Sequence, residues 1–118
     1  MRPTAQEVSV FSTPAAGTQA TCSFAAPSAL QRWVCTSISA TLSGTAAGTA
    51  TLNLRNGATG AGTIIWSKQV TIPANGIWEC NLADLLLPGV YGAAMTLEFA
   101  AGVATDIEAV AMTGYLSA

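Results

Sequence analysis

Hydrophobic and polar residues alternate along most of this chain. In residues 33–42, Val34, Ile38 and Leu42 fall on one face of an extended segment, while Ser37 and Ser39 fall on the other. Because successive side chains of a strand point to opposite faces, such alternation predicts strands with one buried side. The same pattern recurs clearly in 49–55, 63–72 and 94–99, and more weakly in 7–12, 20–25, 76–83 and 106–115.

About eight strands are therefore predicted, joined by segments rich in Gly, Pro, Ala, Ser and Thr. The one helical signal is a single turn at 82–87, which Pro88-Gly89 ends. This pattern favours an all-β fold, an antiparallel two-sheet sandwich of the eight-stranded jelly-roll type. We expect residues 1–20 to form an extended N-terminal arm and residues 21–118 the sandwich domain.

The stretch 54–67, LRNGATGAGTIIWS, is the segment most like a functional motif. Gly57, Gly60 and Gly62 lie in one short loop, and glycine loops can hold phosphate. A phosphate loop, however, leads into the N-terminus of a helix, whereas this one leads into a β-branched, alternating segment. The sequence predicts a hairpin connection that opens with an Asn56-Gly57 turn.

Charged residues make up 8% of the chain, and the net charge is −2. Ordinary soluble domains carry about 25% charged residues. Either a Ser/Thr/Asn surface keeps the molecule in solution or other subunits cover much of it, and we favour the second. The four basic residues are spread along the chain, which argues against nucleic-acid binding. The first residues do not resemble a signal peptide, and the uncharged run 33–54 is too polar for a membrane span.

The three tryptophans are candidates for a sugar-binding surface, as in carbohydrate-binding modules. Trp66 shares a face with Ile64 and Val70, and Trp78 shares one with Cys80, so both are expected in the core. Trp33 begins its strand on the polar face, which makes it the best candidate for an interface or ligand contact.

Acidic residues offer one notable pair, Asp106 and Glu108, two apart on a predicted strand and hence on one face. Such a pair can contribute to a Ca²⁺ site, but oxygen cages usually draw on more acids, so we expect a solvated edge or an inter-subunit contact. With no His in the chain, Lys68 is the available base for a nucleophile, and nothing places it near one. We expect no enzyme activity, no catalytic residues, no cofactor and no metal.

Cys22, Cys35 and Cys80 form no CxxC motif, and without His the ligand set is too small for zinc. Three reduced thiols in a protein made in the cytosol are expected. A Cys22–Cys35 disulfide is the alternative.

Residues 54–100 resemble a pattern found in small virion proteins of tailed bacteriophages. The resemblance is carried by LRNG, the GATGAG loop, a Trp-bearing strand, the IPANG turn, the PGVYG loop and AMTLEF. It implies a β-sandwich that assembles with copies of itself or with a capsid or tail lattice, and it supplies no catalytic residues.

The expected function is that of a capsid decoration or cement subunit. It would bind the major capsid protein or other virion proteins, form a homo-oligomer such as a dimer or trimer, and be located in the virion after assembly in the host cytoplasm. A tail or fibre component and a carbohydrate-binding module using Trp33 are the alternatives.

Overall fold

The computed structural model describes residues 6–118, and this range holds nine strands and no helix. The strands are β1 (Val8–Ser12), β2 (Thr21–Phe24), β3 (Arg32–Gly44), β4 (Gly48–Asn56), β5 (Thr63–Ile72), β6 (Gly76–Leu82), β7 (Leu87–Pro88), β8 (Met95–Phe99) and β9 (Asp106–Ser117). All eight predicted strands are present, and β7 is an addition. The helical turn expected at 82–87 is wrong, because Asp84 adopts a left-handed φ of 57° that a right-handed helix does not accept.

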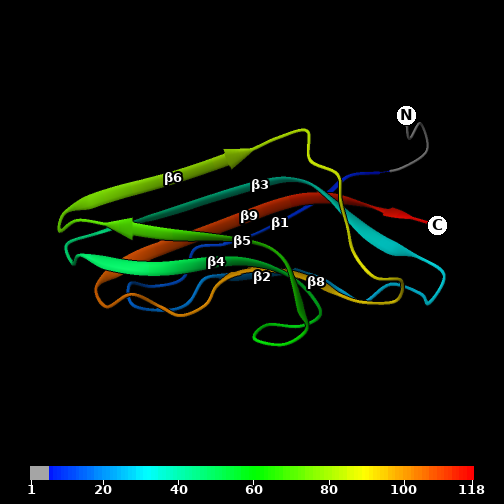
Figure 1. Cartoon of the computed structure of the whole chain (residues 1–118), viewed down its shortest axis with the longest axis horizontal. Coiled ribbons are helices and arrows are strands. Elements are labelled where there is room, and N and C mark those ends of the chain that lie inside the picture. The colour runs from blue at the N-terminus through cyan, green and yellow to red at the C-terminus, as the bar shows by residue number, and fades with distance from the viewer. Residues whose placement is uncertain (1–5) are drawn as a thin grey trace.

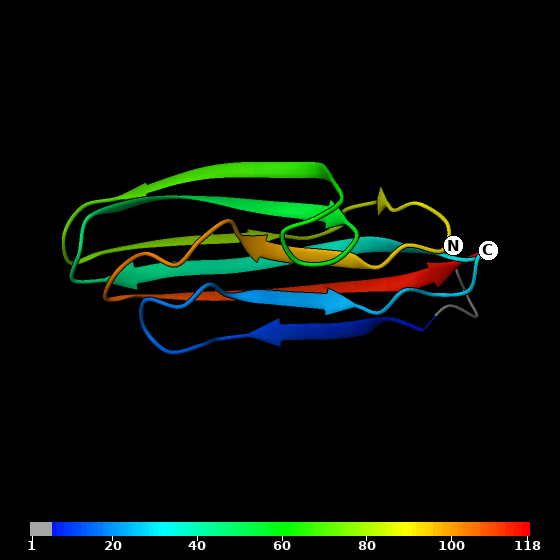
Figure 2. The ribbon, with the colours of Figure 1, turned by 90° about the horizontal axis from the view of Figure 1, so that it is seen from below.

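The strands form two antiparallel sheets that pack face to face (Figure 1, Figure 2). Sheet A has the order β1-β9-β3-β6, with β7 paired to β3, and sheet B has the order β2-β8-β4-β5. Apart from the two-residue β7, each sheet alternates strands from the two ends of the chain, which is the jelly-roll arrangement. The predicted fold class, an antiparallel two-sheet sandwich, is confirmed.

The core lies between the sheets and follows the predicted alternation along most strands. Its largest fully buried apolar side chains are Phe24, Ile38, Leu42, Leu52, Leu54, Met95, Leu97, Phe99 and Met112. Two irregularities of strand pairing change which residues reach this core, and both alter an expectation from the sequence.

The first irregularity is a β-bulge in β3, where the pairing with β9 shifts between Cys35 and Ser37. A bulge inserts one extra residue and so exchanges the faces of the residues on either side of it. Trp33 therefore points inward, where it is 9% exposed, stacks on Phe24 with ring centroids 4.3 Å apart, and donates its indole N–H to the Ala25 carbonyl at 2.8 Å. The expectation that Trp33 makes an interface or ligand contact is wrong.

The second irregularity lies between β4 and β5, where the register shifts between Leu54 and Arg55. Ile64 pairs with Arg55 and is exposed, although the sequence places it in the core with Trp66. Trp66 is half-buried and packs against the core, as does Trp78, whose ring meets Phe99 edge to face. The core placement of these two tryptophans is confirmed.

Part of the expected N-terminal arm is a strand of the sandwich. Val8–Ser12 pairs along its whole length with β9 of the same chain, from Val8 opposite Gly114 to Ser12 opposite Val110. Residues 1–5 lie outside the described residues.

Replacing Trp33 by Ala is expected to destabilise the fold by about 3–5 kcal/mol, because it removes the stack on Phe24 and leaves a cavity. Urea unfolding of the variant measures this loss. Phe11→Ala is the control: Phe11 is 80% exposed, so its removal should change the free energy of unfolding by no more than about 0.5 kcal/mol. Equal stability of Trp33→Ala and the parent would contradict the burial of this ring.

Candidate functional site

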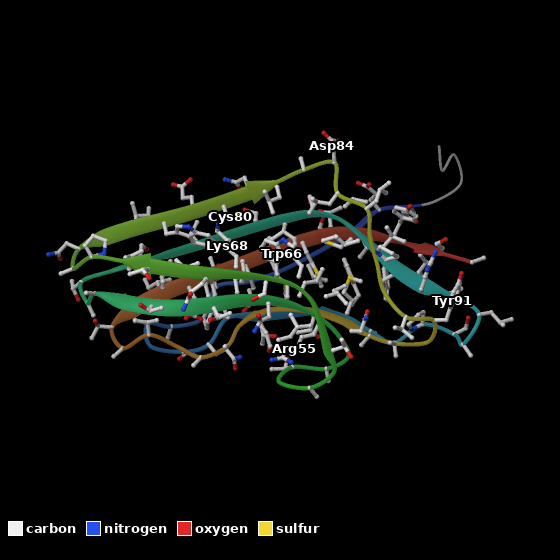
Figure 3. The ribbon with its side chains drawn as sticks, viewed as in Figure 1. Arg55, Trp66, Lys68, Cys80, Asp84 and Tyr91 are labelled. Atoms are coloured by element: carbon white, nitrogen blue, oxygen red, sulfur yellow. The ribbon has the colours of Figure 1, made fainter. Side chains whose placement is uncertain are left out.

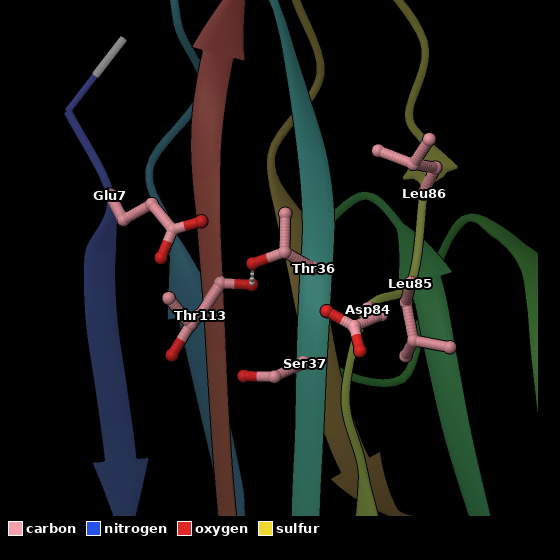
Figure 4. A pocket seen from close by; sticks show the side chains of 7 residues that line it. All are labelled: Glu7, Thr36, Ser37, Asp84, Leu85, Leu86 and Thr113. Carbon is pink, nitrogen blue, oxygen red and sulfur yellow. Dashed lines mark hydrogen bonds between the residues drawn. The ribbon is translucent and has the colours of Figure 1, made fainter. Parts of the chain in front are cut away.

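A trough of about 420 Å³ lies on the outer face of sheet A. Its floor is formed by hydroxyl side chains of two paired strands, Thr113 on β9 and Thr36 and Ser37 on β3. Glu7, just before β1, stands on one side, and the segment 84–86, between β6 and β7, stands on the other (Figure 4). We call this hollow, lined by Glu7, Thr36, Ser37, Asp84, Leu85, Leu86 and Thr113, the hydroxyl trough.

Local structure holds the Asp84 side and the floor of the trough in place. The Leu85 amide donates to the Thr36 carbonyl at 2.9 Å, which fixes the segment carrying Asp84 beside β3. Asp84 is exposed and sits at a positive φ, a conformation that Asp and Asn tolerate better than most residues. The Thr36 hydroxyl donates to the Thr113 carbonyl at 3.2 Å, across the bulge in β3. The bulge that buries Trp33 therefore also shapes the floor of the trough.

A second, smaller hollow of about 120 Å³ lies on the same face of sheet A. Phe11 of β1 borders it, and Ser39, Thr41, Ala109 and Ala111 are among its other lining residues. Thr41 comes four residues after Ser37 in β3, which corresponds to about 13 Å along the strand. The two hollows thus follow one another along β3, with an exposed aromatic ring beside the second.

This face offers hydroxyl groups together with the carboxyl groups of Glu7 and Asp84 for hydrogen bonding. Hydroxyl groups both donate and accept, an ionised carboxylate such as that of Asp84 only accepts, and small Ala side chains leave the surface flat beside Phe11. Sequence reasoning missed this site. The Ser and Thr alternation along 37–41 was visible, but nothing in the sequence placed Asp84 or Glu7 beside it.

The glycine loop of residues 57–62 joins β4 to β5, as predicted, and it folds across β8 on the outer face of sheet B (Figure 2). There it covers Glu98, which is 1% exposed and pairs with Arg55 at 2.8 Å. The Gly60 amide donates to the same Glu98 oxygen at 2.9 Å. Gly62 has a φ of 81°, and a Cβ there would collide with the Asn56 carbonyl. The loop thus holds an anion, but that anion is the protein's own carboxylate.

Asp106 and Glu108 share one face of β9, as predicted, but that face points into the sandwich. Both are completely buried, so the expectation of a solvated edge is wrong. The cause is the register of β9 with β3, which places Glu108 opposite the core residue Leu42. The pKa of Glu108 is raised to about 7, mainly because the carboxyl group is buried. The hydrogen bond from the Ala20 amide opposes this increase in pKa, and the nearby Asp106 adds to it.

The remaining residues considered from the sequence do not meet at a reactive centre. Lys68 lies exposed on β5 (Figure 3), and within residues 6–118 no hydrogen bond or ion pair joins it to a Ser or Cys. Cys22, Cys35 and Cys80 are free thiols, and burial raises the pKa of Cys22 to about 12 and that of Cys35 to about 11. These two thiols are therefore poor nucleophiles.

The described part of the chain contains neither a cluster of metal-binding side chains nor a helix that could span a membrane. Residues 6–118 contain no group of three or more His, Cys, Asp or Glu side chains placed to hold a metal ion. Over the same range, no helix has the length and apolar character needed to span a membrane.

In metal-free buffer, the contribution of Glu108 to stability is expected to decrease as the pH rises from 4.5 to 7. The folded protein holds its proton up to about pH 7, whereas the unfolded chain loses it near 4.5, so folding becomes less favourable across this window. The full effect is up to about 3 kcal/mol. Glu108→Gln should remove this slope and Glu79→Gln should retain it, as measured by urea unfolding against pH. An unchanged slope in Glu108→Gln would contradict the raised pKa.

No family model and no curated protein matches this sequence. Several solved structures are similar to this chain at low TM-scores. One is a CBM4 module at 11% identity and a TM-score of 0.48, covering 92% of this chain and 77% of its own. Another is CsCBM6-3 from Clostridium stercorarium in complex with cellobiose, at 14% identity and a TM-score of 0.41, covering 96% and 82%. A chain of infectious bursal disease virus, Gx strain, is 9% identical with a TM-score of 0.32, covering 94% and 31%. All three TM-scores are below 0.5, so the β-sandwich is assigned from the strand pairing of this chain and not from these similarities.

Proposed function

We propose that this protein is a non-catalytic module that binds a neutral glycan along the outer face of sheet A. The observation that supports this proposal is the hydroxyl trough, which carries Asp84 at its side and is continued along β3 toward the exposed ring of Phe11. The site differs from the one first considered for a carbohydrate-binding module, because Trp33 lies in the core.

A neutral sugar chain complements this face in three ways. Its hydroxyls donate to the Asp84 carboxylate in charge-assisted hydrogen bonds, which are stronger than neutral ones. Its hydroxyls also exchange hydrogen bonds with Ser37 and Thr113, which donate and accept alike. The apolar C–H face of a sugar ring packs against an exposed aromatic ring such as that of Phe11. The Asp84 carboxylate would repel a negatively charged polysaccharide.

Asp84→Asn is expected to weaken glycan binding about 10- to 100-fold, because a hydrogen bond to a charged group contributes about 1.5–3 kcal/mol. Asn tolerates the left-handed φ of this position, so the segment should keep its shape. A glycan array with neutral and anionic oligosaccharides identifies the ligand, and titration calorimetry with the best neutral one gives the affinity. Phe11→Ala should also weaken binding without loss of stability.

Glu79→Gln provides the matched control. Glu79 is an exposed acid on β6, in the same sheet, but it lines neither hollow. Its replacement should leave the affinity unchanged. The proposal fails if no neutral glycan binds at millimolar concentration, or if Glu79→Gln weakens binding as much as Asp84→Asn does.

An assembly subunit of a virion is a second candidate, and a specific surface favours it. The loops 25–31 and 88–94 lie side by side at one end of the sandwich, joined by a hydrogen bond from the Gly92 amide to the Gln31 carbonyl. Leu30, Val90 and Tyr91 are exposed on these loops, and the Arg32 guanidinium lies 4.9 Å from the centre of the Tyr91 ring. Apolar side chains gathered in this way are typical of contacts between proteins.

The double variant Leu30→Ser/Val90→Ser tests this candidate. If this end of the sandwich mediates assembly, the parent protein should sediment as a dimer or trimer and the variant as a monomer with the same thermal unfolding midpoint. A monomeric parent that is absent from purified virus particles would rule the assembly function out.

A further inference from the structure

Asp106 and Glu108 lie where three chain segments meet at one end of the sandwich. Asp106 begins β9, at the end where the β3–β4 connection turns, and residues 15–20 cross beside it (Figure 1). The Gly17 amide donates to the Asp106 carbonyl at 2.8 Å. A Cβ on Gly44 would overlap the Asp106 carboxylate, so the backbone of β3 passes directly against it. The carboxylate pair is thus enclosed by backbone.

Each of these carboxylates has one satisfied oxygen and one unsatisfied oxygen. Asp106 Oδ1 accepts from the Ala46 amide at 3.1 Å, and Glu108 Oε1 accepts from the Ala20 amide at 3.0 Å. Asp106 Oδ2 and Glu108 Oε2 are buried and have no hydrogen-bond partner among the described residues. Two buried carboxylate oxygens on one face of a strand without hydrogen-bond partners are unusual in a native protein and point to a bound species.

No basic side chain of the described range supplies the missing positive charge. Arg55 is paired with Glu98 on the other sheet, the Arg32 guanidinium lies over Tyr91, and Lys68 is exposed on β5. An uncompensated buried charge costs several kcal/mol even after relaxation of its surroundings. Two such charges on one face of a strand therefore need a cation, or else a proton, in the folded state.

We propose that Asp106 and Glu108 are the side-chain ligands of one Ca²⁺ ion bound within this end of the sandwich. Ca²⁺ takes six to eight oxygen ligands in flexible geometry and accepts backbone carbonyls and water beside carboxylates. The enclosing segments 15–20 and 44–46, and residues 102–105 just before Asp106, carry such carbonyls. Mg²⁺ demands a stricter octahedron, and zinc prefers nitrogen and sulfur ligands, whereas this chain has no His.

The proposed calcium site shares no residue with the hydroxyl trough, so it is independent of the proposed glycan binding. With two carboxylates, the site resembles the weaker class of calcium sites, for which dissociation constants are about 10⁻⁴–10⁻³ M. Binding would join the three segments to β9 and stabilise the folded state only.

The test measures the thermal unfolding midpoint of chelator-treated protein at pH 7.5, without and with about 10 mM CaCl₂, which exceeds the weakest affinity expected. The midpoint of the parent should rise by about 5–10 °C with Ca²⁺ and much less with Mg²⁺. Asp106→Asn and Glu108→Gln should each lose the calcium-dependent rise. The exposed-acid variant Glu79→Gln should keep it, and so should Asp84→Asn, which removes one of the two acids that line the trough.

Equilibrium dialysis of the parent with ⁴⁵Ca²⁺ completes the test and does not depend on the folding of any variant. One ion bound per chain with the expected affinity supports the site. No ion bound, or binding that Asp84→Asn abolishes, overturns it. Stabilisation of the parent by acidic pH but not by Ca²⁺ also overturns it, because a proton would then satisfy the pair.

Discussion

Burial of carboxylates is the constraint on which much of this sandwich depends. Three of the six acidic side chains, Glu98, Asp106 and Glu108, are removed from solvent in a chain that has only four basic residues. Glu98 is compensated by Arg55 and by the amide of Gly60, so its burial fixes the glycine loop to the outer face of sheet B. Asp106 and Glu108 receive only backbone amides. One end of the fold therefore encloses two carboxyl groups that no basic side chain of the described residues pairs with.

This distribution changes what the low charge of the chain means. A charge-poor composition suggests a surface covered by other subunits. Here, however, half of the acidic side chains are buried, and the outer faces of the sheets are rich in Ser and Thr. A surface of hydroxyl groups is solvated without charge, so low charge does not by itself require partner subunits. The same hydroxyls are the groups that a sugar chain engages in the proposed binding mode.

The fold was predictable from the sequence because strand alternation is a local signal that the sandwich preserves along most of its length. The site was not, because two bulges and one loop interrupt that signal. The bulge after Cys35 exchanges faces and buries Trp33, and the register shift at Leu54 exposes Ile64. The alternation in β8 turns Glu98 away from the core, but the glycine loop covers it. Alternation predicts the direction of a side chain, not what lies over it.

The bulge in β3 also connects stability to the proposed binding face. The extra residue, Thr36, lets Trp33 turn inward to stack on Phe24, and the same residue contributes its hydroxyl and carbonyl to the trough. Without the bulge, Trp33 would lie on the outer face of the sheet. The hydrogen bond from the Leu85 amide to the Thr36 carbonyl, which positions Asp84, would also be lost. A bulge beside a binding surface is a common device for aiming side chains. The stack of Trp33 on Phe24 and the floor of the hydroxyl trough thus depend on one inserted residue.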